Sequence, residues 1–232
     1  MSDPSPTTPP IASPGRRDDV AYIAPMATFL GFNYIGSTWP ALYPFAYAIK
    51  TVVVAILLWM FWKHYTRVRW NFWWLGVIVG IVGVFQWVGM QLLLQKYFEF
   101  FRPGEGGFVP PDSINTPGLL IGFYVIRIVG ASLVVPVMEE LFWRDYLWRS
   151  IAAPNNFKLV PVGYRDGMAM LCVAGAFAFV HGNWWLTSIP WALMIAGLLW
   201  YTRSLGACIV AHGVTNLLLA GYVLYTRDWS FW

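Results

Sequence analysis

Long runs of apolar residues dominate this chain, and they constrain its fold more than any other feature. The clearest run extends from Gly118 to Val137 and contains a single charge, Arg127. A helix needs about 20 apolar residues to cross a bilayer. Hydrophobic residues make up 58% of the 232 residues and charged residues only 11%, whereas about a quarter of a soluble domain is charged. The sequence therefore predicts an integral membrane protein.

Apolar segments of roughly spanning length follow one another along the chain. They predict an all-α, polytopic membrane helix bundle with seven transmembrane helices, or eight if a further span or a re-entrant piece is present. Residues 1–20 are rich in Pro, Ser and Thr and are predicted to form a disordered polar tail, with 21–232 as a single transmembrane domain. The segments are 21–38, 43–62, 73–94, 118–149, 166–183, 185–202 and 205–225.

Two residues inside these segments interrupt the pattern. The segment 118–149 is too long for one straight crossing, and Pro136 is expected to kink it or to split it in two. Lys50 lies within the second segment. We expect its side chain to snorkel to the surface or to mark a later start of the helix.

Basic residues in the loops predict the orientation. Most of them fall before the first segment, after the second, around the fourth-to-fifth connection and after the sixth, whereas Lys96, Arg102 and Arg227 fall on the opposite side. The positive-inside rule then places the N-terminus in the cytoplasm and, with seven spans, the C-terminus outside. The net charge of +4 is a topology signal of this kind, and no basic cluster is dense enough to predict a nucleic-acid partner.

One short polar stretch ends the run Gly118–Val137. It contains Glu139, Glu140 and Arg144, and ionisable groups at membrane depth cost at least ~2.5 kcal/mol each and are usually retained for function. On a helix, Glu140 and Arg144 are spaced i, i+4 and can pair. Glu139 lies about 100° around the helix, which leaves its carboxylate free to handle a proton.

Three further polar residues occur inside apolar segments. His181 ends an apolar run in the fifth segment, and His212 and Asn216 share a helix face in the seventh. Counted from the nearest basic loop at ~1.5 Å per residue, Glu139 and His212 lie about 15 and 13 Å deep. His181 lies about 24 Å deep by the same measure, so a tilted helix, or one that begins near Gly167, is needed to bring it to the same level.

At these residues the sequence resembles the CAAX prenyl protease and bacteriocin-processing family of glutamate-type intramembrane proteases. The family motifs Glu-Glu-x-x-x-Arg, Phe-x-x-x-His and His-x-x-x-Asn are complete and in order within residues 118–220. The small size and aromatic richness are similar to the bacterial branch, in particular the CAAX-protease-related members associated with exosortase systems. The motifs read Glu139-Glu140-x-x-x-Arg144, Phe177-x-x-x-His181 and His212-x-x-x-Asn216.

The resemblance implies an endopeptidase that acts inside the membrane without a metal or another cofactor. Glu139 with His181 would activate a water molecule, and His212 with Asn216 would stabilise the oxyanion. Glu140 and Arg144, supported by Phe177, would hold the geometry of the site. Asp145 stands where many relatives carry glycine, and we expect it to affect local packing more than catalysis.

Two other functions fit the same residues. A zinc peptidase could use Glu139, His181 and His212 as ligands, although no His-Glu-x-x-His motif is present. A non-catalytic scaffold, immunity protein or small transporter could retain the polar cluster for assembly.

The expected partners are the lipid bilayer and a peptide or protein substrate in or at the membrane. The bacterial resemblance implies the bacterial inner membrane. The sequence does not predict an oligomeric state.

Overall fold

The computed structural model describes residues 16–103 and 108–232, and this part of the chain is helical and contains no strand. Most of the predicted N-terminal tail lies outside the described residues. Helix α1 (Arg16–Thr38) begins within the last residues assigned to this tail. Asp18 and Asp19 lie in the first turn of α1, where negative side chains interact favourably with the partial positive charge of a helix N-terminus.

Each of the seven predicted segments contains helix, which confirms the all-α prediction. A short helix, α4 (Pro110–Ser113), lies in the connection before the fourth segment. The longer elements after α1 are α2 (Tyr43–Met60), α3 (Trp73–Tyr97), the continuous run Pro117–Ala152, α8 (Gly167–Val180), α9 (Trp185–Thr202) and α10 (Leu205–Thr226).

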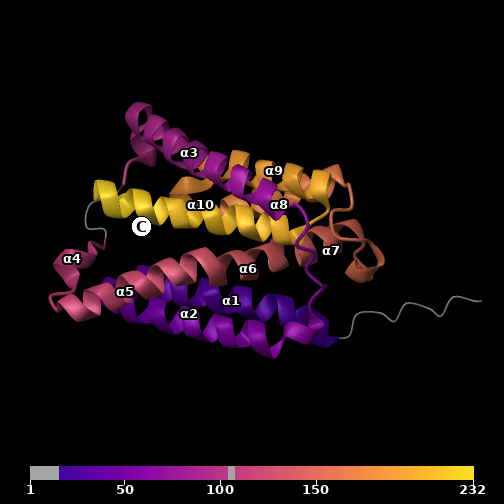
Figure 1. Ribbon diagram of the computed structural model, residues 1–232, viewed down its shortest axis with the longest axis horizontal. Coiled ribbons are helices and arrows are strands. Elements are labelled where there is room, and N and C mark those ends of the chain that lie inside the picture. The colour runs from indigo at the N-terminus through magenta and orange to yellow at the C-terminus, as the bar shows by residue number, and fades with distance from the viewer. Residues whose placement is uncertain (1–15, 104–107) are drawn as a thin grey trace, which may run out of the picture.

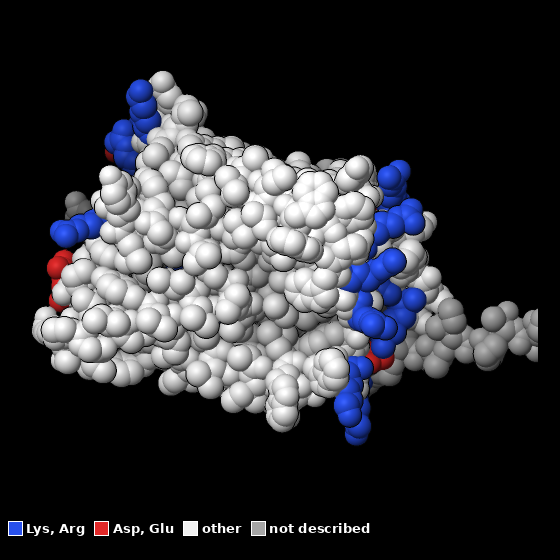
Figure 2. Space-filling view, viewed as in Figure 1, with Lys and Arg blue, Asp and Glu red and all other residues white. Residues whose placement is uncertain are grey.

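The chain is an integral membrane protein by the length and apolar character of its helices. Within the described residues, four helical segments are long and apolar enough to cross a membrane: Pro40–Met60, Trp73–Tyr97, Pro117–Ala152 and Leu205–Thr226. The predicted number of seven crossings is not reached by this measure and stays a prediction. Figure 2 shows an uncharged band between two charged ends on the face in view.

The helices run roughly side by side in two layers (Figure 1). Helices α1 and α2 lie in one layer with α5 (Pro117–Val129) and α6 (Val135–Glu140), and α3, α8, α9 and α10 lie in the other. Helix α10 packs extensively along α3 and also contacts α6 and the turn before it. It therefore joins the two layers.

Small residues on α3 allow α10 to approach closely. A Cβ atom added at Gly76 would lie 2.4 Å from the carbonyl oxygen of Ala207, and one added at Gly80 would lie 2.6 Å from that of Ala211. Both distances are shorter than van der Waals contact. Small side chains are common where membrane helices pack backbone to backbone, and here they fix the position of α10 against α3.

The run Pro117–Ala152 is not split at Pro136, contrary to one of the two predicted outcomes. It stays helical but contains two π-helical turns, Gly130–Val134 before α6 and Leu141–Leu147 after it, and ends in α7 (Trp148–Ala152). Proline lacks the backbone N–H and its ring clashes with the carbonyl of residue i−4. The π-helical turn Gly130–Val134 changes the backbone hydrogen-bond pattern just before Pro136, so that the chain continues as a helix past the proline. Such turns often occur at functional sites, and the second one directly follows Glu139 and Glu140.

Candidate active site

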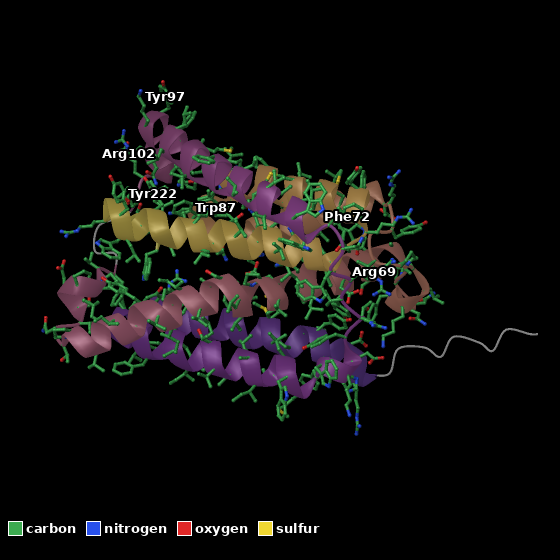
Figure 3. All side chains as sticks on the ribbon, in the orientation of Figure 1. Arg69, Phe72, Trp87, Tyr97, Arg102 and Tyr222 are labelled. Atoms are coloured by element: carbon green, nitrogen blue, oxygen red, sulfur yellow. The ribbon has the colours of Figure 1, made fainter. Side chains whose placement is uncertain are left out.

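A cavity of about 410 Å³ lies between the two layers. Side chains from both layers line it, including Trp87, which lies midway along α3 (Figure 3). The four residues predicted to carry chemistry all line this cavity: Glu139, His181, His212 and Asn216. The structure therefore brings together residues from three segments that are far apart in the sequence.

The two adjacent carboxylates have different surroundings. Glu139 is 7% exposed and lines the cavity, and its Oε2 atom has no hydrogen-bond partner among the described residues. Glu140 is 0% exposed, and its Oε1 atom lies 3.2 Å from Nη1 of Arg144 and 2.9 Å from Nδ1 of His212. The pairing of Glu140 with Arg144, predicted from the i, i+4 spacing, is confirmed. Glu140 also binds His212, which the sequence did not predict.

Arg144 is buried among aromatic rings. Its guanidinium carbon lies 5.1 Å from the ring centre of Phe177 and 5.5 Å from that of Trp191. Cations over aromatic faces are attracted by the negative face of the ring, so these contacts offset part of the cost of burying the charge. Phe177, which was predicted to support the site, thus contacts Arg144 directly.

His181 follows the last residue of α8 and lines the cavity together with Glu139. Helix α8 begins at Gly167, the start that was expected to bring His181 closer to the level of Glu139. The Nδ1 atom of His181 lies 2.6 Å from the carbonyl oxygen of Phe177. A carbonyl only accepts hydrogen bonds, so Nδ1 carries the proton, and Nε2 of the neutral ring is left as an acceptor.

His212 and Asn216 lie one turn apart on α10. The Nδ1 atom of His212 donates to the carboxylate of Glu140, and the imidazole ring lies 4.7 Å from the ring of Trp191. The amide nitrogen of Asn216 donates to the carbonyl of Ala131 at 2.7 Å. A side-chain amide has two N–H donors, so Asn216 keeps one donor beyond this bond.

An aromatic wall connects the two imidazoles. The ring of Phe177 lies 4.2 Å from that of His181 and stacks on Trp191 at 5.2 Å, and Trp191 contacts His212. The sequence analysis missed Trp191. No local signal distinguishes it, because the chain contains 15 tryptophans and many lie in apolar segments.

Lys50 and Arg127 line the same cavity. The prediction for Lys50 was wrong in both its forms: α2 begins at Tyr43, well before it, and the side chain is 5% exposed instead of reaching the surface. Its Nζ atom donates to Oδ1 of Asn33 on α1 at 2.6 Å. An ionisable residue inside a spanning segment is by itself a signal for a functional site, and this signal was available in the sequence.

Asp145 forms a buried network outside the cavity. Its carboxylate accepts hydrogen bonds from the hydroxyl of Tyr22 at 2.7 Å and from that of Thr66 at 3.1 Å, and it pairs with Arg149. These partners come from α1, from the α2–α3 connection and from α7. Asp145 therefore ties three parts of the chain together, as expected for a packing role.

The zinc alternative requires Glu139, His181 and His212 to surround one ion. Within residues 16–103 and 108–232, no three His, Cys, Asp or Glu side chains are grouped closely enough to hold a metal. The geometry gives this alternative no support.

These features define a class: a helical integral membrane protein with a carboxylate, two imidazoles and an amide around one interior cavity. Residues 121–218 match the family model described as Type II CAAX prenyl endopeptidase Rce1-like. The match confirms the resemblance to the CAAX protease family over the part of the chain that carries all three motifs, and it supports a protease activity. No curated protein and no solved structure matches the chain.

Proposed function

We propose that this protein is an intramembrane endopeptidase that cleaves a membrane-associated peptide or protein with a water molecule activated by Glu139 and His181. One observation carries the proposal. The carboxylate of Glu139 is buried and has an oxygen without a partner, yet it shares a cavity with two imidazoles that are each held by a hydrogen bond at Nδ1. A general base must be within reach of the proton that it removes, and this cavity offers such a place.

In the first step, water attacks the carbonyl carbon of the scissile peptide bond. The new C–O bond forms as Glu139 takes a proton from the water, and the electron pair of the carbonyl moves to its oxygen. The free Nε2 atom of His181 accepts a hydrogen bond from the same water and orients it.

The oxyanion is stabilised by His212 and Asn216. Because Nδ1 of His212 already donates to Glu140, only Nε2 is left to donate to the oxyanion, which requires a proton on both ring nitrogens. The second amide N–H of Asn216 is the other donor. When the intermediate collapses, the C–N bond breaks and the proton held by Glu139 passes to the leaving amine.

The test is Glu139→Gln, which removes the base and keeps the size of the side chain. Loss of a general base typically lowers the rate by ~10²–10⁴-fold. We expect comparative proteomics of membrane fractions to find a peptide terminus that appears in cells with the wild type and is absent in cells with the variant. The matched control is Glu99→Gln, because the Glu99 side chain is 91% exposed. This control should process the peptide like the wild type.

The outcomes separate the possible functions. Identical membrane proteomes with a folded Glu139→Gln protein would overturn the peptidase proposal and favour a non-catalytic scaffold. Processing that is present in the wild type but stops when a strong chelator is added would instead indicate a metal-dependent peptidase. Processing that survives the chelator supports the mechanism above.

A further inference from the structure

A second set of charged residues faces the cavity from the layer formed by α1, α2 and α5. Lys50 and Arg127 stand against the same aromatic ring, that of Tyr47, with Nζ of Lys50 at 4.1 Å and the guanidinium carbon of Arg127 at 4.5 Å from the ring centre. Nη1 of Arg127 also donates to the Tyr47 hydroxyl at 2.9 Å. All three side chains line the cavity that contains Glu139 and His181.

The described residues that line this cavity bring two cations, Lys50 and Arg127, against a single carboxylate, that of Glu139. Among the described residues, Lys50 and Arg127 take part in no ion pair. The hydrogen-bond acceptor of Lys50 is the neutral amide of Asn33, and the buried Nε atom of Arg127 has no partner in the described part of the chain. Glu139 is the one carboxylate among the residues that line the cavity.

Such an arrangement needs a compensating charge from elsewhere. Charged side chains within a membrane are costly to bury, and contacts with aromatic rings offset only part of that cost. Lys50 lies ten residues before the end of α2 at Met60, which corresponds to about 15 Å along the helix. The pair therefore lies well inside the helical segment. Glu139 offsets one of the two positive charges, so a ligand in the cavity is the source of a second negative charge.

We propose that Lys50, Arg127 and Tyr47 form a carboxylate-binding subsite of the cavity. The proposal rests on the peptidase function, because a peptide substrate brings carboxylates as its anionic groups. The bound group is either the free C-terminal carboxylate or an acidic side chain near the cleaved bond. In both cases the subsite positions the peptide relative to Glu139, and it selects substrates by charge.

The competing explanation is structural: Lys50 ties α2 to α1 through Asn33. This role predicts that changes at Lys50 alter the stability and the binding of all peptides equally. A carboxylate-binding subsite predicts instead that changes at Lys50 alter the preference for carboxylate-bearing peptides over neutral ones. The ratio of the two amounts bound is therefore the quantity to measure.

The experiment uses the full chain with Glu139→Gln in lipid nanodiscs, so that bound peptides are not cleaved. The probes are pools of apolar octapeptides of randomised sequence, made as free acids or as C-terminal amides, each with or without one internal glutamate. Retained peptides are quantified by mass spectrometry. Charge-assisted hydrogen bonds contribute enough to predict an enrichment of ~10–100-fold for carboxylate-bearing peptides.

Enrichment of free acids identifies the C-terminus as the ligand, and enrichment of glutamate-containing amides identifies an acidic side chain. Lys50→Met or Arg127→Met should reduce either enrichment to near one. Lys50→Gln retains a donor for Asn33 and should also lose the enrichment, which covers the case in which Lys50→Met does not fold. The control Lys96→Met removes an exposed cation and should keep the preference.

The subsite is overturned if peptides with and without a carboxylate are retained equally or if no pool is retained. It is also overturned if the preference for carboxylates survives both charge removals. Because binding is measured without turnover, the result is independent of the cleavage assay. Enrichment together with a failed cleavage test would leave the subsite in place and remove the peptidase function.

Discussion

At the scale of single residues, the site depends on the difference between two neighbouring glutamates. The Oε1 atom of Glu140 binds both Arg144 and His212, whereas Glu139 lines the cavity and has no hydrogen bond to another side chain in the described part of the chain. Removing one member of a buried ion pair is strongly destabilising, because the other charge is left uncompensated. The same substitution at the two positions should therefore have different effects on stability.

We expect Glu140→Gln to lower the free energy of unfolding by ~3–5 kcal/mol, because it leaves the buried guanidinium of Arg144 without a counter-charge. Glu139→Gln should lower it by less, because no ion pair to Glu139 is present among the described residues. Thermal unfolding of the purified variants in detergent measures both. If the two variants unfolded at the same temperature, the buried pair of Glu140 and Arg144 would not contribute to stability as expected.

At the scale of helices, the position of α10 decides where His212 and Asn216 lie. Helix α10 is placed by α3, where Gly76 and Gly80 leave room for the backbone of α10. On its other side, Gly213 of α10 approaches the π turn before Pro136, since an added Cβ atom would lie 2.7 Å from the carbonyl oxygen of Ser132. Glycines on both α3 and α10 thus set the distance between the imidazole and the two glutamates.

Gly80→Ala tests this packing. The new methyl group would lie 2.6 Å from the carbonyl oxygen of Ala211 and 2.7 Å from Cβ of Val214. Overpacking of this kind costs ~1–3 kcal/mol, and we expect a lower unfolding temperature and reduced cleavage. The matched control is Gly89→Ala on the same helix, where no atom lies within 4 Å. Equal stability of the two variants would argue against close packing of α3 and α10.

At the scale of the whole molecule, the charges gather at two ends (Figure 2). Arg69 and Phe72 lie at one end, and Tyr97 and Arg102 lie at the other (Figure 3). Two of the basic residues used to predict the orientation, Arg144 and Arg149, are buried in the bundle instead of lying in a loop. The prediction then rests on the remaining basic residues of the loops, and the cytoplasmic location of the end that carries Arg69 remains a prediction.

The orientation is tested by labelling single cysteines with a membrane-impermeant maleimide. In a Cys172→Ser background, which removes an exposed thiol, Arg102→Cys should react in intact bacterial spheroplasts. Arg69→Cys should react only after the membrane is opened. Both arginines are exposed, so burial does not explain a difference. The reverse pattern would invert the predicted topology, and labelling of both from one side would contradict the spanning arrangement.

The helices and the motif residues were predictable from the sequence because their signals are local. In lipid the backbone must satisfy its hydrogen bonds within one helix, so an apolar run is enough to predict a helix. The i, i+4 spacing of Glu140 and Arg144 likewise depends only on the helix repeat. The π turns beside Pro136 and the early start of α1 were missed, because local propensity fixes neither the exact hydrogen-bond pattern nor the first helical residue.

The sequence by itself determined the all-α membrane class and the set of polar residues that the bundle has to bury. Only the tertiary structure decided which of these residues meet. The placement of Lys50 and Arg127 on the cavity wall, the bond from His212 to Glu140 and the network around Asp145 all join residues from different helices. They depend on how each helix is rotated and how closely it packs, and these quantities are set by contacts between distant segments.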